Sequence, residues 1–245
     1  MDILNDDVIG YILSKLTIKN IGICLRINKK WKQIIEIYCW LFDLKFSNMN
    51  IKDESLKYFK NTKKIYLNEC HEITDGGLEY LGGVHTIYLY NCNKITDNGL
   101  AYLKGVQHIF LDAHNKITEK GLQHLKKVHT IGLFYKEMTD DGLKYLKEVQ
   151  TIVLFRCDKI TDNGLKYLKK VHALFISHCN QITDSGLEHL KKVNTIYLSG
   201  CNKITDNGLK HLKNAKKIYI GNCDKITDDG IGYLAKVYNI KIRRL

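Results

Sequence analysis

One stretch of sequence recurs through most of the chain and constrains its fold more than any other feature. Close copies of Ile95-Thr96-Asp97-Asn98-Gly99-Leu100 begin at Ile73, Ile117, Met138, Ile160, Ile182, Ile204 and Ile226. The apolar residue that opens each unit recurs at a constant spacing, as from Ile65 to Ile87. Only the step from Ile131 to Ile152 is shorter, by a single position. A fixed period of this kind is the signature of a protein built from stacked repeats.

Each unit reads as a short strand followed by a short helix. The opening Ile-x-Leu alternation fits a strand whose alternate side chains point inward, and the Thr-Asp pair offers oxygen atoms that cap the next helical turn. In Gly-Leu-x-x-Leu-x-x-Val the apolar residues fall at i, i+3 and i+6, on one face of a helix. One unit cannot cover its own apolar face, so the units must stack. Residues 48–62 read as a degenerate half-repeat, with Ile51, Leu56 and Phe59 at its apolar positions.

The cysteines belong to the repeat. Six of the eight occupy one repeat position, namely Cys70, Cys92, Cys157, Cys179, Cys201 and Cys223. Side chains at one repeat position point in parallel into the same core, and free cysteine is among the most buried residue types. One thiol per repeat also differs from the local pairs that hold zinc. The pattern predicts free buried thiols in a reducing compartment, with no metal and no cofactor.

Composition narrows the class of protein. With 245 residues, 44% of them hydrophobic and 26% charged, the chain resembles ordinary globular proteins. It opens without a basic region followed by an apolar run, and no apolar stretch approaches the roughly 18 residues of a membrane span. We therefore expect an intracellular protein, cytoplasmic or nuclear, that does not enter a membrane.

The charged residues invite two functional interpretations. A net charge of +12 suggests nucleic-acid binding. However, the lysine pairs at 126–127, 169–170 and 191–192 recur with the repeat and lack the interleaved aromatic residues of a base reader. A solvated outer face fits them better. Seven Thr-Asp pairs, with Glu119 in the third repeat, resemble an acidic row, but as stacked helix caps they need no catalytic role. No nucleophile, phosphate-loop or metalloprotease motif is present, which predicts a protein without catalytic residues.

The first 45 residues have a different, helical pattern. Val8, Ile9, Ile12, Leu13 and Leu16 share one face, which predicts a helix over about 6–15. A second, short helix is expected to open near Asn20, and a third after Asn28, with Trp31, Ile34, Ile35 and Tyr38 on one face. Three short helices make a weak core by themselves, so something must pack against them.

This segment resembles an F-box. The resemblance rests on Leu4-Asn5-Asp6-Asp7-Val8-Ile9-x-x-Ile12-Leu13-Ser14-x-Leu16, on Ile27-Asn28-Lys29-Lys30-Trp31-Lys32 and on Trp40-Leu41. The chain departs from the family pattern where Asn5, Thr17 and Ile18 stand in place of prolines and where Asn28 stands in place of cysteine. The alternative is a small capping bundle in which Trp31 and Trp40 fill the core, since solenoids need capped ends.

The repeat itself resembles the cysteine-containing leucine-rich repeat, as Val-x-x-Ile-x-Leu-x-x-Cys-x-x-Ile-Thr-Asp shows. This resemblance implies an α/β solenoid: a horseshoe with a parallel sheet on the concave side and short helices on the convex side, preceded by a small three-helix F-box. We predict the F-box over residues 1–46. The solenoid is predicted over 47–245, with the half-repeat, about eight 22-residue repeats and a terminal strand, and with strands beginning at Ile65.

Together the two resemblances imply a substrate receptor of a cullin-RING (SCF-type) ubiquitin ligase, in the ubiquitin-conjugation pathway. The F-box would bind a Skp-type adaptor, and through it a cullin, while the repeats hold a protein substrate near the conjugating enzyme. The motif residues that would build or line the adaptor surface are Leu4, Val8, Ile12, Leu13, Leu16, Ile27 and Trp31. A non-ligase binding scaffold, with the helices as a cap, is the main alternative; a nucleic-acid binder is more distant.

The substrate site is expected where the repeats differ from one another. One strand column is nearly uniform, with aromatic residues from Tyr66 to Tyr219, and stacking alone can explain it. The positions beyond it vary, and the middle repeats place large side chains there. Aromatic and arginine side chains dominate binding hot spots, although unconstrained drift would give the same variation. The predicted substrate-binding residues are Asp112, Phe134, Tyr135, Phe155, Arg156 and His178.

Overall fold

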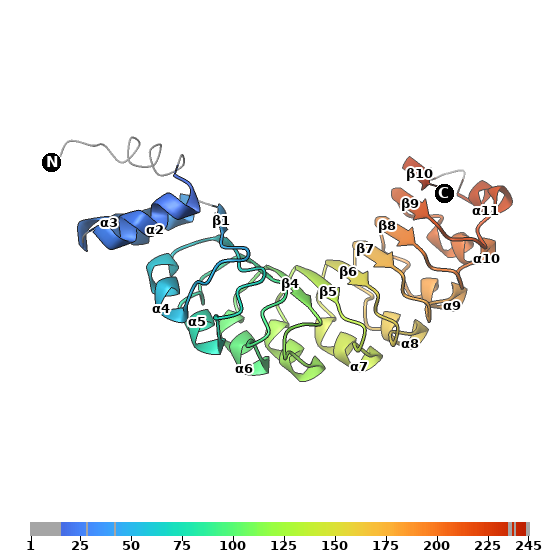
Figure 1. Ribbon diagram of the computed structural model, residues 1–245. Helices are drawn as coiled ribbons and strands as arrows, with labels where there is room; N and C mark the ends of the chain where they lie inside the picture. Colours follow the sequence, from blue (N-terminus) through green and yellow to red (C-terminus); the bar gives the residue numbers. More distant parts are fainter. Residues whose placement is uncertain (1–15, 28, 42, 235–236, 238, 244–245) are drawn as a thin grey trace. The chain divides into compact units, whose positions relative to one another are not determined.

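The computed structural model describes residues 16–27, 29–41, 43–234, 237 and 239–243, and its strands and helices alternate along the chain (Figure 1). Within these residues ten strands follow one another in the sheet in chain order. The strands are β1 (Asp43–Lys45), β2 (Lys64–Tyr66), β3 (Thr86–Leu89), β4 (His108–Asp112), β5 (Thr130–Phe134), β6 (Thr151–Phe155), β7 (Ala173–Ser177), β8 (Thr195–Ser199), β9 (Lys217–Gly221) and β10 (Asn239–Arg243). The predicted leucine-rich-repeat solenoid is confirmed.

Within the described residues two helices precede the first strand, and short helical turns follow the strands. The α-helices are α2 (Ile18–Ile27), α3 (Lys29–Tyr38), α4 (Asp53–Leu56), α5 (Asp75–Glu79), α6 (Asp97–Leu100), α7 (Asp140–Leu143), α8 (Asp162–Leu165), α9 (Asp184–Leu187), α10 (Asp206–Leu209) and α11 (Asp228–Gly232). The 3₁₀ turns are η1 (Cys39–Leu41), η2 (Lys57–Phe59), η3 (Ala101–Leu103), η4 (Glu119–Leu125), η5 (Lys144–Leu146) and η6 (Lys210–Leu212). A 3₁₀-helix has three residues per turn, so it keeps apolar residues spaced by three on one side.

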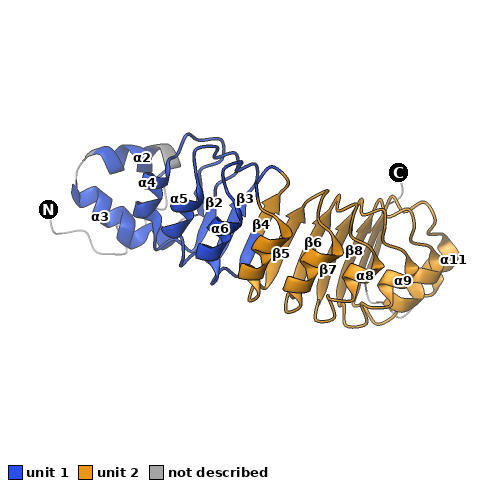
Figure 2. Cartoon of the chain, turned by 90° about the horizontal axis from the view of Figure 1, so that it is seen from below, with its two compact units in different colours: residues 1–109, 114–116 blue, residues 110–113, 117–245 orange. Residues whose placement is uncertain are grey.

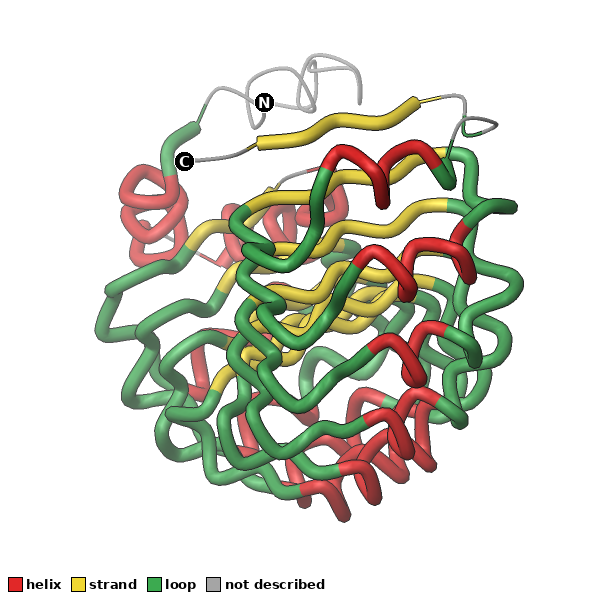
Figure 3. The backbone as a smooth tube through the Cα atoms, turned by 90° about the vertical axis from the view of Figure 1, so that its right-hand side faces the viewer, coloured by secondary structure: helices red, strands yellow, loops and turns green. Residues whose placement is uncertain are grey.

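The chain forms two compact units, 1–109 with 114–116 and 110–113 with 117–245 (Figure 2). In the first unit β1, β2 and β3 pair in parallel, and in the second β5 to β10 do so. Equivalent residues stand side by side, as Ile152 does with Ile131 and with Leu174. Within each repeat the strand and the helical turn lie on opposite sides of the coil (Figure 3). The inward strand residues and the helix leucines are fully buried between them, as Leu154 and Leu165 are.

The solenoid starts earlier than the sequence suggested. Residues 48–62 were predicted to be half a repeat, yet β1 precedes them and aligns Leu44 with Ile65 of β2. Leu44, Leu56 and Phe59 are all buried, so strand and helix form a complete first repeat. The strand was missed because its step to the next repeat is shorter than the usual period and its sequence, Asp43-Leu44-Lys45, lacks the usual Ile-x-Leu. The domain boundary near residue 46 stays a prediction.

The Thr-Asp pairs form a ladder that ties one repeat to the next. The threonine is the N-cap residue of its helical turn, and the aspartate accepts two hydrogen bonds from the threonine of the following repeat; Asp162, for example, accepts from Thr183 N at 2.8 Å and from its Oγ1 at 2.6 Å. The bonds from Thr227 hold the pKa of Asp206 below its usual range. A Cβ on Gly186 would lie 2.4 Å from Asp162 Oδ1, which explains the glycine two residues after the aspartate. The acidic row is therefore structural.

The cysteine ladder is buried and reduced. All eight cysteines are free, and each of the six in the ladder is buried. The thiols donate to carbonyl oxygens of the preceding repeat, as Cys92 Sγ does to Leu67 O at 2.9 Å and Cys70 Sγ to Phe46 O at 3.2 Å. Burial raises the pKa of the Cys70 thiol to about 11. The ladder is thus a set of hydrogen-bonded core groups.

Two repeats in the middle of the chain lack the cysteine and fill its place differently. His114 occupies the cysteine position by sequence, but it is exposed, and the adjacent Asn115 is buried instead. Asn115 Nδ2 donates to Leu89 O at 2.8 Å, which is the bond a thiol would make. In the next repeat Tyr135 is only 7% exposed, and its hydroxyl donates to Ile117 O at 3.0 Å. Asn115 thus replaces the thiol as the donor to a strand carbonyl, whereas the Tyr135 hydroxyl donates to a carbonyl beyond the strand.

The helical head precedes β1. The predicted first helix lies outside the described residues. The second begins at Ile18, two residues before the expected Asn20, because Thr17 Oγ1 accepts a hydrogen bond from Asn20 N at 3.3 Å and so caps the helix. The third, α3, lies where it was predicted. The head rests on the first repeat: Asn61 Nδ2 donates to Glu36 O at 2.9 Å.

Candidate functional site

The predicted substrate residues of β5, β6 and β7 form a cluster, which we name the ring cluster: Phe134, Phe155, Arg156 and His178. The ring centroids of Phe134 and Phe155 are 5.7 Å apart, with an interplanar angle of 43°. His178 meets Phe155 edge-on at 6.1 Å, and the Arg156 guanidinium lies over Phe155 at 5.4 Å from the ring centroid. Phe134 and Phe155 are half-buried, and Arg156 and His178 are exposed. The arrangement offers apolar ring surface beside a fixed cation.

Two glycines make room for these rings. A Cβ on Gly132 would lie 2.4 Å from a ring carbon of Phe110 and 3.2 Å from one of Phe134. A Cβ on Gly200 would lie 2.5 Å from Nδ1 of His178. Phe110 therefore extends the aromatic surface toward Phe134. Sequence reasoning assigned Phe110 to the uniform column, and the signal that marks its different role is the glycine at the equivalent position of the next strand.

Arg156 and His178 occupy a strained backbone position. Their φ angles are +54° and +53°, in the left-handed region that favours glycine and asparagine. The equivalent residues of other repeats, also with positive φ, are Asn48, Glu69, Asn91, Gly200 and Asn222. A non-glycine side chain there costs on the order of 1 kcal/mol. The position also accepts Glu69 in the first unit, so the backbone angle alone assigns no role. What distinguishes Arg156 and His178 is that two consecutive repeats place basic side chains beside the same rings.

The remaining two predicted substrate residues, Tyr135 and Asp112, lie outside the ring cluster. Tyr135 is in the core, where it replaces the cysteine, so its side chain does not belong to the exposed ring cluster. The short repeat, which lacks one residue, turns this tyrosine inward. Asp112, the last residue of β4, is half-buried on the strand face that carries Phe110. It is the acidic residue of that strand.

The uniform aromatic column is stacked. Tyr66 and Tyr88 lie 4.3 Å apart and nearly parallel, at 11°. In the second unit the centroids of Phe175 and Tyr197 are 6.3 Å apart, and those of Tyr197 and Tyr219 are 6.2 Å apart. Cross-strand contacts of this kind stabilise a sheet. This column therefore has a structural explanation. The Phe134–Phe155 pair shares it, and the ring cluster differs in the guanidinium and the imidazole that lie beside its rings.

The head presents apolar side chains to solvent. Of the predicted adaptor residues, Leu4, Val8, Ile12 and Leu13 lie outside the described residues, as does the side chain of Ile27. Leu16 and Trp31 are half-buried. Large apolar side chains that sequence reasoning did not single out are exposed: Ile23 by 44%, Ile37 by 56% and Trp40 by 51%. Trp40 does not fill a core, contrary to the capping-bundle alternative.

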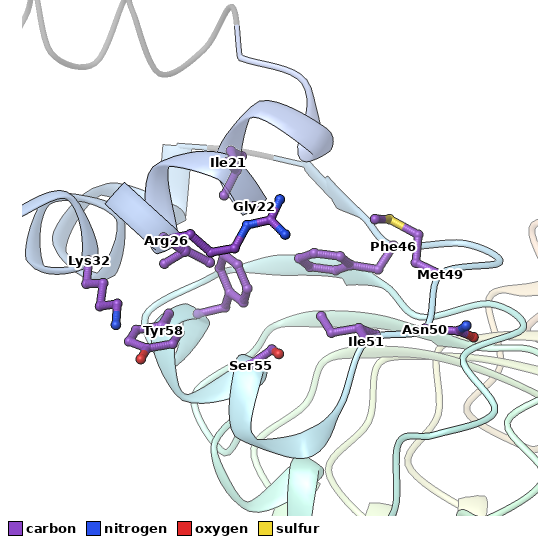
Figure 4. Close-up of a pocket in the computed structure, with 12 residues that line it drawn as sticks. Ile21, Gly22, Arg26, Lys32, Phe46, Met49, Asn50, Ile51, Ser55 and Tyr58 are labelled. Atoms are coloured by element: carbon purple, nitrogen blue, oxygen red, sulfur yellow. The ribbon is translucent and has the colours of Figure 1, made fainter. Parts of the chain in front are cut away.

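A hollow of about 450 Å³ lies between the head and the first repeat (Figure 4). Its lining includes Ile21 and Phe46, both buried, and its rim carries Arg26 and Lys32. Phe46 and Phe59, ring centroids 5.1 Å apart, form part of the apolar lining, and Lys32 lies over the Tyr58 ring. The hollow is therefore lined mainly by apolar side chains, while Asn61 and Lys60 of the first repeat make polar contacts with Glu36 of the head.

Across the described residues, no group of three or more His, Cys, Asp or Glu side chains is placed to hold a metal ion. None of the helices in that part of the chain has the length and apolar character needed to cross a membrane.

Comparison with known proteins identifies both parts of the chain. The profile of the F-box domain matches residues 1–41, and that of the leucine-rich repeat matches residues 167–191 and 189–213. An F-box domain at the N-terminus is thus followed by leucine-rich repeats. Families with this combination are typically non-catalytic. Among curated protein sequences, none matches the chain significantly.

Two solved structures show the repeat fold. An internalin C2 from Listeria monocytogenes aligns with 78% of this chain and 84% of its own, at 23% identity and a TM-score of 0.52. An internalin, inlF, from the same organism aligns with 85% of this chain and 70% of its own, at 17% identity and a TM-score of 0.55. These similarities concern the fold alone.

Proposed function

We propose that this chain, an F-box domain followed by leucine-rich repeats, is the substrate-recognition subunit of an SCF-type ubiquitin ligase. The observation that carries the proposal is the F-box match over residues 1–41, directly ahead of β1. The head would bind a Skp-type adaptor and the repeats a protein substrate. The chain would supply proximity and no chemistry, because it raises the effective concentration of the substrate near the conjugating enzyme.

The exposed apolar residues of the head support adaptor binding. Trp40 lies within the F-box match, and so do Ile23 and Ile37. The three lie on α2, α3 and η1 of the head, and exposed large apolar side chains are candidates for an interaction surface. We add these three to the motif residues Leu4, Val8, Ile12, Leu13, Leu16, Ile27 and Trp31 as candidates for the adaptor surface. The free cysteines agree with an intracellular, reducing compartment.

The ring cluster is the proposed substrate site. Its rings and guanidinium are the side-chain types that dominate binding hot spots, and two of its members are basic residues at positions where glycine or asparagine fits the backbone better. The proposed adaptor surface of the head and the ring cluster share no residues. Adaptor binding and substrate binding are therefore expected to be separable by mutation.

The test is co-purification of the full-length chain with a Skp-type adaptor and a cullin, followed by mass spectrometry of the bound proteins. Substitution is preferable to deleting residues 1–46, since that deletion removes β1 from the sheet. Trp40→Ala, at an exposed position, should weaken adaptor binding without unfolding the chain. Lys213→Ala, at an exposed lysine after η6, is the control. If the wild-type chain binds no Skp-type adaptor, the non-ligase scaffold becomes the better interpretation.

A further inference from the structure

The strand face that carries the ring cluster is unusual in its charge. In β6 to β8 the outward-facing residues alternate with buried ones, and none of the residues of β5 to β10 is Asp or Glu. Lys217 and Lys241 are exposed on this face, and Arg156 and His178 extend it just past the ends of β6 and β7. In the part of β4 that belongs to this unit, Asp112 is the one carboxylate. The face therefore presents cations and few acids to a partner.

Aromatic surface lies between these cations. The row Phe175, Tyr197 and Tyr219 runs across β7, β8 and β9, and Lys241 lies over the Tyr219 ring at 5.8 Å from its centroid. Phe155 stands two residues beyond Val153 on β6, so it faces the same side roughly 7 Å along the strand. A partner on this face would contact the aromatic rings. It would meet Arg156 and His178 past the ends of β6 and β7, and Lys217 and Lys241 on β9 and β10.

Arg156 is prepared to receive a carboxylate. Its guanidinium carbon lies over the Phe155 ring, 5.4 Å from the centroid, and this cation–π contact favours a side-chain position beside the ring. Within the described residues Arg156 has no ion pair. A guanidinium held this way binds a carboxylate through two parallel hydrogen bonds, at lower entropic cost than a free side chain.

We propose that the ring cluster binds an acidic segment of a partner protein in which an aromatic or aliphatic residue is flanked by carboxylates. The apolar residue packs on Phe134 and Phe155, and a carboxylate binds Arg156, with His178 beside it. This inference rests on the proposed function, because it names the substrate class of that same site. It explains why two strained backbone positions carry basic side chains where the next two repeats have Gly200 and Asn222.

The lysines of the helical side are the competing explanation for any acidic binding. Lys169 and Lys191 are exposed there, and the described residues hold no ion-pair partner for either. They recur with the repeat and form point charges. If binding were a matter of net charge alone, removing these lysines would weaken it as much as removing Arg156.

The experiment measures fluorescence anisotropy of three synthetic peptides with the full-length chain. Their central residues are Glu-Glu-Phe-Glu-Glu, Gln-Gln-Phe-Gln-Gln and Glu-Glu-Ala-Glu-Glu, between identical Gly-Ser flanks. We expect the first to bind about tenfold more tightly than either of the others, since each lost contact at a hot spot costs on the order of 1 to 2 kcal/mol. Arg156→Gln and Phe155→Ala should each weaken the first peptide about fivefold or more. Lys169→Gln with Lys191→Gln should leave it unchanged.

Three results would overturn the inference: equal binding of all three peptides, no binding of the first, or an equal loss in the double lysine variant. Adaptor binding is measured on the same preparations. A chain that binds adaptor but shows no preference for the acidic aromatic peptide retains the proposed function and loses this substrate class. A chain that prefers that peptide but binds no adaptor loses the ligase function and keeps the acidic site.

Discussion

Strands β6 and β7 and strands β8 and β9 have matched backbones and different side chains at their ends. All four pair in parallel with the same register, and the residue after each strand has a positive φ between 49° and 59°. Past β6 and β7 that residue is Arg156 or His178; past β8 and β9 it is Gly200 or Asn222. The fold accepts all four, as it accepts Glu69 at the equivalent position of the first unit, so the two pairs of strands differ in side-chain chemistry on a common backbone.

The rest of each repeat varies far less, because its groups have partners in the next repeat. The ladders of aspartate, threonine and cysteine and the buried leucines are the framework that holds both pairs of strands. The comparison predicts that framework changes reduce stability, whereas changes at the ends of β6 and β7 reduce binding and leave stability intact or improved. The predictions below test that division in order of expected effect.

The largest effect is expected in the core. Leu143, in α7, is fully buried, and Leu143→Ala should lower the free energy of unfolding by about 2 to 5 kcal/mol. Lys170→Ala should change it by less than about 0.5 kcal/mol, because the Lys170–Glu148 pair is exposed. Urea denaturation measures both. A small cost at Leu143 would mean that the repeats do not depend on one another as proposed.

The aspartate ladder should show the next largest effect. Asp162→Ala removes two acceptors from Thr183 and should cost about 1 to 3 kcal/mol. Asp229→Ala is the matched control, since Asp229 is exposed in α11 and, among the described residues, accepts no hydrogen bond from a threonine of another repeat. It should change stability by only a few tenths of a kcal/mol. Equal costs for the two variants would show that the ladder contributes charge and no structure.

The buried thiols should make the first unit sensitive to alkaline pH. The pKa of Cys70 is raised from 9.0 to about 11 by burial, so the folded state holds its proton where the unfolded state releases it. Stability is therefore retained below about pH 9 and falls as pH rises toward 11, by about 1 to 3 kcal/mol from this thiol. Urea midpoints at pH 8 and 10.5 measure the loss.

The pH experiment needs a variant that removes the thiol and one that does not. Cys70→Ala should lower stability at pH 8 but show a shallower decline at alkaline pH than the wild type. Val106→Ala, which also removes buried atoms of the first unit, should decline as steeply as the wild type. If Cys70→Ala has the same slope as Val106→Ala, the thiol is not what titrates.

The sequence predicted the repeat fold well because each repeat confirms the others. Ile, Leu and Cys at fixed spacing specify strand, helix and core before any contact is known. The exceptions were not predictable in the same way. That Asn115 rather than His114 turns inward depends on which side chain reaches Leu89 O. That Tyr135 turns inward depends on a repeat one residue shorter, and β1 was hidden by a similarly shortened step to the next repeat.

The candidate site was predicted in its residue types but not in its geometry. The repeats differ at Phe134, Phe155, Arg156 and His178, and this variation was visible in the sequence. Their mutual distances and the positive φ of Arg156 and His178 were not, because both arise from the stacking of neighbouring strands. The position of Phe110 was not predicted either, because it depends on the absence of a side chain at Gly132, whose place the Phe110 ring occupies.

The smallest expected change in stability is the sharpest test of the difference between the two pairs of strands. It is a gain in the free energy of unfolding, whereas the framework variants above lose stability. Arg156→Asn gives β6 the residue that β9 has in Asn222. Asparagine tolerates the left-handed conformation better than arginine, so the free energy of unfolding should rise by about 0.3 to 1 kcal/mol. Binding of the acidic aromatic peptide should fall in the same variant. Asn222→Gly, the matched control, should leave binding unchanged. A variant at Arg156 that loses stability as well as binding would place the arginine in the framework and remove the distinction between the two pairs of strands.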